Sequence, residues 1–175
     1  MASVFRAHDP ELDRTVAIKV LPSFRQEDPT FVERFRRGAQ AVAVLNHPNI
    51  VQIYDFGDDK GFMYIVMEHV PGGTLHDKMG RRFTVEELLR HIGPVADALE
   101  HAHSQGIIHR DVKPSNILID ESGKAILSDF GLARMLNQQI TGGSLYGTLE
   151  YMSPEQAMGR PVDAKSNLYS LGIII

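Results

Sequence analysis

The chain has 175 residues, of which 43% are hydrophobic and 23% charged, a composition typical of one soluble globular domain with a real core. Its formal net charge is −4, so it has no basic field to hold nucleic acid or an anionic membrane. It contains no cysteine, which excludes disulfides and thiolate metal sites and fits a reducing compartment. The N-terminal residues lack the apolar core of a signal peptide, and no apolar run approaches the about 20 residues of a membrane span. We therefore expect a cytoplasmic protein, with room for a membrane anchor outside these residues.

The first third of the chain predicts two pairs of strands separated by a helix. Apolar and β-branched residues fill residues 3–7 and 15–21, and a turn sequence lies between them. Apolar residues at three- and four-residue steps predict a helix over 29–45, which Pro48 prevents from continuing. A second strand pair is predicted at residues 50–54 and 62–67, with the turn at 58–61.

A longer helix is predicted to begin after Thr84. Thr84 and Glu87 form the sequence pattern of a capping box, in which each side chain bonds to the other residue's backbone N–H. His91, His101 and His103 follow along this helix. Their spacings do not place a metal-binding pair on one helical face, so we interpret them as surface or packing residues.

The most informative stretch is the polar octapeptide 109–116. It lies between the apolar runs 106–108 and 117–119, a pattern that predicts a strand, a tight loop and a second strand. A further strand at 125–127 then leads to Asp129. Two acids, one amide and one lysine are thereby expected to converge, a combination that suits a phosphoanhydride with its metal ions.

The residues of this stretch match the protein-kinase signature. The catalytic loop pattern is H-R-D-L-x-x-x-N, and here it reads His109-Arg110-Asp111-Val112-Lys113-Pro114-Ser115-Asn116, with valine for leucine as the single change. Ser128-Asp129-Phe130-Gly131 contains the metal-binding D-F-G, and Val16-Ala17-Ile18-Lys19 matches V-A-I-K. Because independent motifs occur in the right order, the chain resembles a bacterial serine/threonine protein kinase of the eukaryotic-like type along essentially its whole length.

The resemblance implies an α+β fold with two lobes. The small lobe, residues 1–67, would be an antiparallel sheet with one helix. A hinge would span 68–73, and a larger, mainly helical lobe would span 74–175. The first two glycines of the glycine-rich loop would precede Met1, and the chain would end within the central helix of the larger lobe, so we expect a kinase domain that is incomplete at both ends.

The resemblance also assigns roles to the polar residues. Asp111 would accept the proton of a serine or threonine hydroxyl on a protein substrate, and Lys113 would neutralise charge on the transferring phosphoryl group. Asn116 and Asp129 would hold two Mg²⁺ ions, or Mn²⁺ in their place. The ATP-binding residues implied by the family motifs are Val4, Ala17, Lys19, Met67, Glu68, Val70 and Leu118.

Residues 132–149 are polar and carry no sustained period, as in the activation loop of the family, and Ser153-Pro154-Glu155 follows at the A-P-E position. Thr141 or Ser144 would carry a regulatory phosphate, which Arg110 could bind and which a kinase–kinase dimer could deposit. Thr148 would instead contact Asp111 and Lys113. Ordinary loop composition explains each hydroxyl equally well.

Two residues depart from the family pattern. Gly38 stands where the helix glutamate that pairs with Lys19 is expected, and Glu33, about 140° away around the helix, is a poor substitute. Asn167 stands where the family has an aspartate that braces the catalytic loop; an amide can accept one such bond but carries no charge. The sequence therefore predicts a serine/threonine kinase, with a degenerate kinase that binds nucleotide or acts as a scaffold as the alternative.

Overall fold

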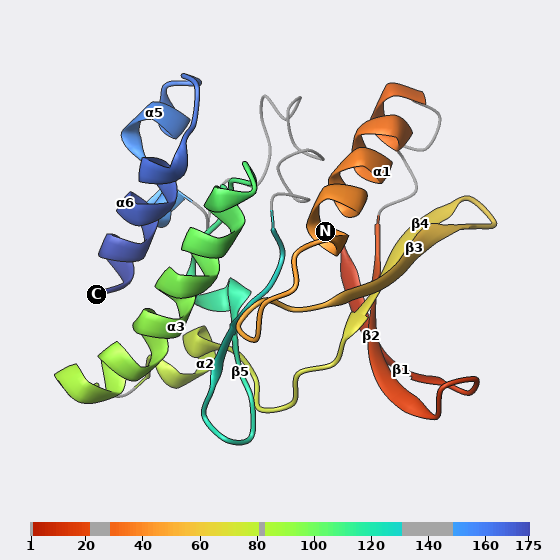
Figure 1. Ribbon diagram of the computed structural model, residues 1–175, viewed down its shortest axis with the longest axis horizontal. Coiled ribbons are helices and arrows are strands. Elements are labelled where there is room, and N and C mark those ends of the chain that lie inside the picture. The colour runs from red at the N-terminus through yellow and green to blue at the C-terminus, as the bar shows by residue number, and fades with distance from the viewer. Residues whose placement is uncertain (1, 22–28, 81–82, 131–148) are drawn as a thin grey trace. The chain divides into compact units, whose positions relative to one another are not determined.

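The computed structural model describes residues 2–21, 29–80, 83–130 and 149–175 (Figure 1). The chain forms two compact units. The first contains Met1–Asn46 and Val51–His69, and the second contains His47–Ile50 and Val70–Ile175. The predicted α+β class is confirmed, because the first unit is built on an antiparallel sheet and the second is mainly helical.

The first unit is built on a four-stranded antiparallel sheet with the order β1-β2-β4-β3. Its strands are β1 (Ser3–Asp9), β2 (Arg14–Val20), β3 (Ile53–Asp59) and β4 (Phe62–Glu68). The two strands predicted at the start of the chain are confirmed. Their turn is held by Asp9, whose Oδ1 accepts the backbone N–H groups of Glu11 and Leu12 at 3.2 and 3.3 Å.

The second predicted strand pair is confirmed as β3 and β4, but the bounds 50–54 predicted for its first strand are wrong. β3 begins only at Ile53 and continues to Asp59, and the turn falls at Lys60 and Gly61, both with positive φ, rather than at 58–61. Ile50, which led to the prediction, is buried instead through an isolated bridge to Leu127 in the second unit. β3 is an edge strand, so its later positions tolerate exposed polar residues.

Helix α1 (Pro29–Ala43) confirms the predicted helix and ends two residues before its predicted end at residue 45. Its apolar stripe is buried: Phe35 is 1% exposed and Ala39 is fully buried. Phe35 also meets Phe56 of β3 edge to face, with ring centroids 6.4 Å apart. Gly38 lies on this buried side of the helix.

The second unit is mainly helical (Figure 1). Its long helix α3 (Val85–Ser104) begins at the predicted capping box. The Thr84 N–H donates to the Glu87 carboxylate at 2.9 Å, and the Glu87 N–H donates to the Thr84 hydroxyl at 3.2 Å. The apolar face of α3 is buried, with Val95, Leu99 and Ala102 at 1% exposure or less. The other elements are α2 (Leu75–Lys78), the 3-10 turns η2 (Pro114–Asn116) and η3 (Leu149–Tyr151), β5 (Ile117–Ile119), β6 (Ala125–Leu127), α5 (Pro154–Ala157) and α6 (Ala164–Ile174).

The strand predicted at 106–108 is also wrong. Gly106 has φ 74°, and the N–H groups of Gly106 and Ile107 bond back to the carbonyls of His103 and Ala102, each at 2.9 Å. These residues therefore close the C-terminus of α3 instead of pairing with a strand. The strands predicted at 117–119 and 125–127 are confirmed as the antiparallel pair β5 and β6. Among the described residues, no helix is long and apolar enough to cross a membrane.

Candidate active site

The β5–β6 hairpin holds the last residue of the octapeptide 109–116 against the residue that precedes Asp129, within the second unit. Asn116, the last residue of the η2 turn, accepts two hydrogen bonds on its backbone oxygen: from the Ser128 N–H at 2.8 Å and from Ser128 Oγ at 3.0 Å. Ser128 directly precedes Asp129. The backbone that leads from the octapeptide and the backbone that leads to Asp129 are therefore held together.

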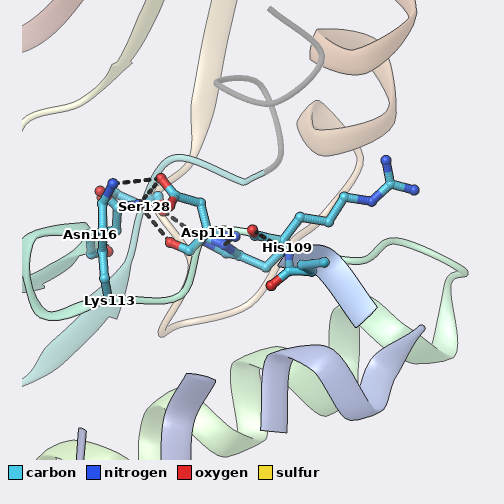
Figure 2. A network of polar contacts seen from close by, with 7 residues as sticks. His109, Asp111, Lys113, Asn116 and Ser128 are labelled. Carbon is cyan, nitrogen blue, oxygen red and sulfur yellow. Dashed lines mark hydrogen bonds and ion pairs between the residues drawn. The ribbon is translucent and has the colours of Figure 1, made fainter. Parts of the chain in front are cut away.

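Asp111 is surrounded by the predicted partners (Figure 2). Its Oδ2 lies 2.8 Å from Lys113 Nζ and accepts Asn116 Nδ2–H at 2.9 Å, and the same amide nitrogen donates to the Asp111 carbonyl at 2.7 Å. Because both partners of Asn116 Nδ2 are acceptors, the amide orientation is fixed and Oδ1 is left for another ligand. The structure thus brings Asp111, Lys113 and Asn116 together as the sequence predicts.

The second carboxylate oxygen of Asp111 is the chemically distinctive atom. Oδ1 is buried and has no hydrogen-bond partner within the described part of the chain. A buried carboxylate oxygen is costly without a donor, so this atom suits an incoming hydroxyl. Thr148, predicted to contact Asp111 and Lys113, lies outside the described residues, as do Thr141 and Ser144.

His109 has a structural role that the sequence did not reveal. It is fully buried, and its Nδ1 lies 3.2 Å from the Asp111 N–H and its Nε2 2.8 Å from the Ser128 carbonyl. Nδ1 therefore accepts and Nε2 donates, which fixes a neutral ring. Burial lowers the pKa of this imidazole, which favours the same neutral form. His109 thus links the start of the octapeptide to Ser128, and its ring also packs on Phe130.

The residue before Asp111 and the residue after Ser128 both have unusual backbones. Arg110 has φ 67° and Asp129 has φ 62°, in the left-handed region that residues other than glycine rarely adopt. Such conformations persist where the surrounding structure holds them, and they cluster at functional sites. Arg110 and Asp129 are two of the four non-glycine residues with positive φ in the described ranges.

The Arg110 backbone is held from both sides. Asn167 Oδ1 accepts its N–H at 2.9 Å, which confirms that the amide keeps one bracing bond, and Gln156 Nε2 donates to its carbonyl at 2.9 Å. Asn167 Nδ2 lies 2.8 Å from His103 Nε2, so His103 contributes more than the simple packing expected of it. Gln156 was not identified from the sequence, although Ser153-x-x-Gln156 is a capping-box pattern.

The donor set fits a divalent metal bound together with phosphates. Asn116 and Asp129 supply an amide and a carboxylate, the hard oxygen ligands that Mg²⁺ prefers. Within the described ranges, the structure contains no group of three or more His, Cys, Asp or Glu side chains that could hold a metal by itself. A metal bound here would therefore take its remaining ligands from a substrate phosphate and water, which is common for Mg²⁺.

In the first unit, the predicted nucleotide-binding residues share one face of the sheet. Lys19 on β2 is opposite Val4 on β1, and Ala17 is opposite Met67 on β4. Residues two apart on a strand point to the same face, so these four side chains lie on one side. Lys19 is only 7% exposed, whereas Val4 is 60% exposed.

The remaining predicted residues are distributed over both units. Glu68, on β4, donates its N–H to the Gln52 carbonyl at 2.9 Å. Val70 and Leu118 belong to the second unit and are half-buried. Glu33 is exposed and pairs with Arg37 at 2.6 Å, so its carboxylate is engaged on the surface of α1.

The whole chain, residues 1–175, matches the protein kinase domain family. It is 45% identical to the serine/threonine-protein kinase PrkC of Bacillus subtilis and 43% identical to the serine/threonine-protein kinase PknB of Mycobacterium tuberculosis. All of the chain is covered in both cases, but it spans only 28% and 30% of those proteins. A crystal structure of the M. tuberculosis PknI kinase domain superposes with a TM-score of 0.80 at 31% identity, covering 99% of this chain and 65% of that one. The chain therefore belongs to the protein kinase family, among the bacterial serine/threonine kinases.

Proposed function

We propose that this protein transfers the γ-phosphate of ATP to serine or threonine hydroxyls of other proteins. The observation that carries the proposal is the state of Asp111. One carboxylate oxygen is held by Lys113 and Asn116, and the other is buried with no partner in the described part of the chain. Such a carboxylate can orient an incoming hydroxyl and accept its proton through Oδ1 while its own position stays fixed.

The second unit would also provide the electrostatic part of the reaction. Lys113, 2.8 Å from Asp111, is placed to neutralise charge on a phosphoryl group approaching the same hydroxyl. Asn116 Oδ1 and the Asp129 carboxylate would hold Mg²⁺ or Mn²⁺. The metal would neutralise phosphate charge, and these residues would fix its position.

The first unit would hold the nucleotide. Lys19 would contact the α- and β-phosphates, and Val4, Ala17 and Met67 share its face of the sheet, which supports their assignment to the adenine site. The backbones of Glu68 and Val70 would bond the adenine, and Leu118 would line the site. In this proposal residues 68–73 form the hinge between a small lobe, 1–67, and a large lobe, 74–175.

Regulation and location are part of the same proposal. The Arg110 side chain would bind a phosphate on Thr141 or Ser144, which a second kinase molecule could deposit. Thr148 would order the substrate-facing segment. We propose a cytoplasmic catalytic domain with protein substrates, which leaves a membrane anchor elsewhere in a longer protein open.

The alternative is a degenerate kinase that binds nucleotide without transferring phosphate. Gly38 is the observation in its favour, because glycine cannot provide the carboxylate that pairs with Lys19 in active kinases. Against it, Asp111, Lys113 and Asn116 form a closed set of interactions. A scaffold would have no chemical need for that set.

Phosphate transfer to a general acceptor protein separates the two functions. We expect label from γ-labelled ATP to enter the acceptor with the wild-type protein and not with Asp129→Asn, because an amide in place of this carboxylate weakens metal binding. Thermal unfolding with and without Mg²⁺–ATP should be measured in parallel. A nucleotide-dependent rise in the unfolding midpoint with incorporation equal to that of Asp129→Asn would support the degenerate kinase and refute the enzyme.

A further inference from the structure

The peptide at Arg110 is fixed at both of its polar atoms by side chains from later in the chain. Asn167 on α6 accepts its N–H and Gln156 on α5 donates to its C=O, each at 2.9 Å. Both side chains are buried, at 1% and 5% exposure. Arg110 has φ 67°, so these two bonds hold a backbone conformation that arginine does not favour by itself.

The two helices that carry this clamp are joined next to it. Ser166, which precedes Asn167, donates its hydroxyl to the carboxylate of Glu155, which precedes Gln156. Ser170, one turn further along α6, donates to the Tyr151 carbonyl in η3 at 2.6 Å. Gln156 and Asn167 are therefore presented to Arg110 by one connected piece of structure.

The orientation of the Gln156 amide is determined by its surroundings. Its Oε1 accepts the Ser153 N–H at 3.1 Å in the capping box at the start of α5, while its Nε2 donates to Arg110. A flipped amide would place an oxygen against the Arg110 carbonyl and a nitrogen against the Ser153 N–H. Both contacts would then be repulsive, so the donor side of Gln156 always faces the catalytic loop.

We propose that Gln156 is a positioning residue for catalysis. Together with Asn167 it holds the Arg110 peptide in its left-handed conformation, and this sets the position from which the next residue, Asp111, presents its carboxylate. The inference rests on the proposed kinase function for its catalytic consequence, but the clamp itself is a structural claim.

Two substitutions at Gln156 isolate the donor. Gln156→Glu keeps an acceptor for the Ser153 N–H but places a carboxylate oxygen against the Arg110 carbonyl. Gln156→Met has a similar volume and lacks the donor without adding charge. Ser153→Ala is the matched control, because it removes the other capping-box bond, to the Gln156 N–H, and leaves the clamp in place.

Steady-state phosphotransfer gives the first readout. Because a displacement of about 1 Å can reduce a rate about 10²-fold, we expect kcat to fall about 10²-fold in both Gln156 variants, with KM for ATP within about twofold of wild type. Ser153→Ala should keep a kcat within about twofold of wild type. A normal kcat in either Gln156 variant, or an equal loss in Ser153→Ala, would overturn the proposal.

Amide hydrogen exchange gives a readout that does not depend on catalysis. The backbone amides of residues 109–112 should exchange faster in Gln156→Glu and Gln156→Met than in wild type or Ser153→Ala, because the clamp no longer limits local opening. Unchanged exchange would overturn the clamp. If the wild-type protein transfers no more phosphate than Asp129→Asn, the kinase proposal fails, and the exchange result still decides whether the clamp exists.

Discussion

Two helices, one in each unit, carry a departure from the family pattern, and the departures differ in kind. On α1 of the first unit, Gly38 replaces an expected glutamate and leaves no side chain at all. On α6 of the second unit, Asn167 replaces an expected aspartate and keeps an oxygen at the same place, 2.9 Å from the Arg110 N–H. The first change deletes a functional group, whereas the second preserves the one atom that the catalytic loop uses.

We infer from this comparison that the acceptor oxygen at position 167 matters more than the residue type that carries it. Asn167 also gains a donor, and its Nδ2 meets His103 Nε2 at 2.8 Å, a bond that requires this nitrogen of His103 to be unprotonated. Both polar atoms of the Asn167 amide therefore have a partner in the second unit. On α1, the carboxylate of Glu33 is paired with Arg37 on the exposed side of the helix, so it does not take the place of the side chain that Gly38 lacks.

The largest effect is expected where the preserved atom is removed. Asn167→Leu leaves the Arg110 N–H without its acceptor in a buried place, which should lower the free energy of unfolding by about 2 kcal/mol. Asn167→Asp, the matched control, keeps the acceptor and should lower it much less. Chemical denaturation of wild type, Asn167→Leu and Asn167→Asp measures the difference. Equal free energies of unfolding for the two variants would show that the acceptor oxygen at position 167 does not stabilise the fold.

A smaller effect is expected where the deleted group is restored. Gly38→Glu should raise the phosphotransfer rate about tenfold, since a charge-assisted bond to Lys19 is worth about 1.5–3 kcal/mol and part of it should act in the transition state. Gly38→Ala improves helix propensity without adding a carboxylate, so it should leave the rate unchanged. If Gly38→Glu transfers phosphate no faster than Gly38→Ala, the missing carboxylate at position 38 does not limit the phosphotransfer rate.

A cap far from the catalytic loop separates stability from positioning. Thr84→Ala removes the bond to the Glu87 N–H at the start of α3, the helix whose other end carries His103. We expect a loss of about 1 kcal/mol in the free energy of unfolding and no change in kcat. A fall in kcat comparable to that of the Gln156 variants would mean that any loss of stability slows the reaction.

The smallest expected effect is a difference in pH dependence. Burial lowers the pKa of His103 below its ordinary value of about 6.5, so below that pH the unfolded chain takes up a proton that the folded chain resists. Stability therefore falls as the pH decreases through this range. In Asn167→Asp the carboxylate would favour the imidazolium, so the loss of stability between about pH 7.5 and 5.5 should be smaller than in wild type. An identical pH dependence of the unfolding midpoint would contradict the His103–Asn167 pairing.

Elements that rest on local patterns were predictable from the sequence, and those that rest on distant partners were not. The capping box at Thr84, the strand β2 and the helix α1 follow from residues within a few positions of one another. The errors arose where an apolar run had a different partner. Ile50 pairs with Leu127 instead of continuing β3, and Ile107 closes α3 through a bond to Ala102.

The catalytic loop shows the same division. The grouping of Asp111, Lys113 and Asn116 was predictable because the three residues lie within one short loop, and the motif fixes their order. The role of Gln156 was not, because its partner lies 46 residues earlier in the chain and the bond goes to a backbone carbonyl that any residue has. The capping-box pattern predicts the bond that Gln156 Oε1 accepts from the Ser153 N–H. No sequence pattern predicts the bond that its Nε2 donates to the Arg110 carbonyl.

The most direct test of the catalytic role of Asp111 is the single-turnover rate of γ-phosphate transfer at saturating ATP, compared between wild type and Asp111→Asn. In the proposed reaction Asp111 is the proton acceptor, so the substitution should slow transfer about 10²- to 10⁴-fold, while the rise of the unfolding midpoint with Mg²⁺–ATP stays the same in both proteins. Equal transfer rates in the two proteins would contradict the assignment of Asp111 and, with it, the proposed catalytic role of this loop.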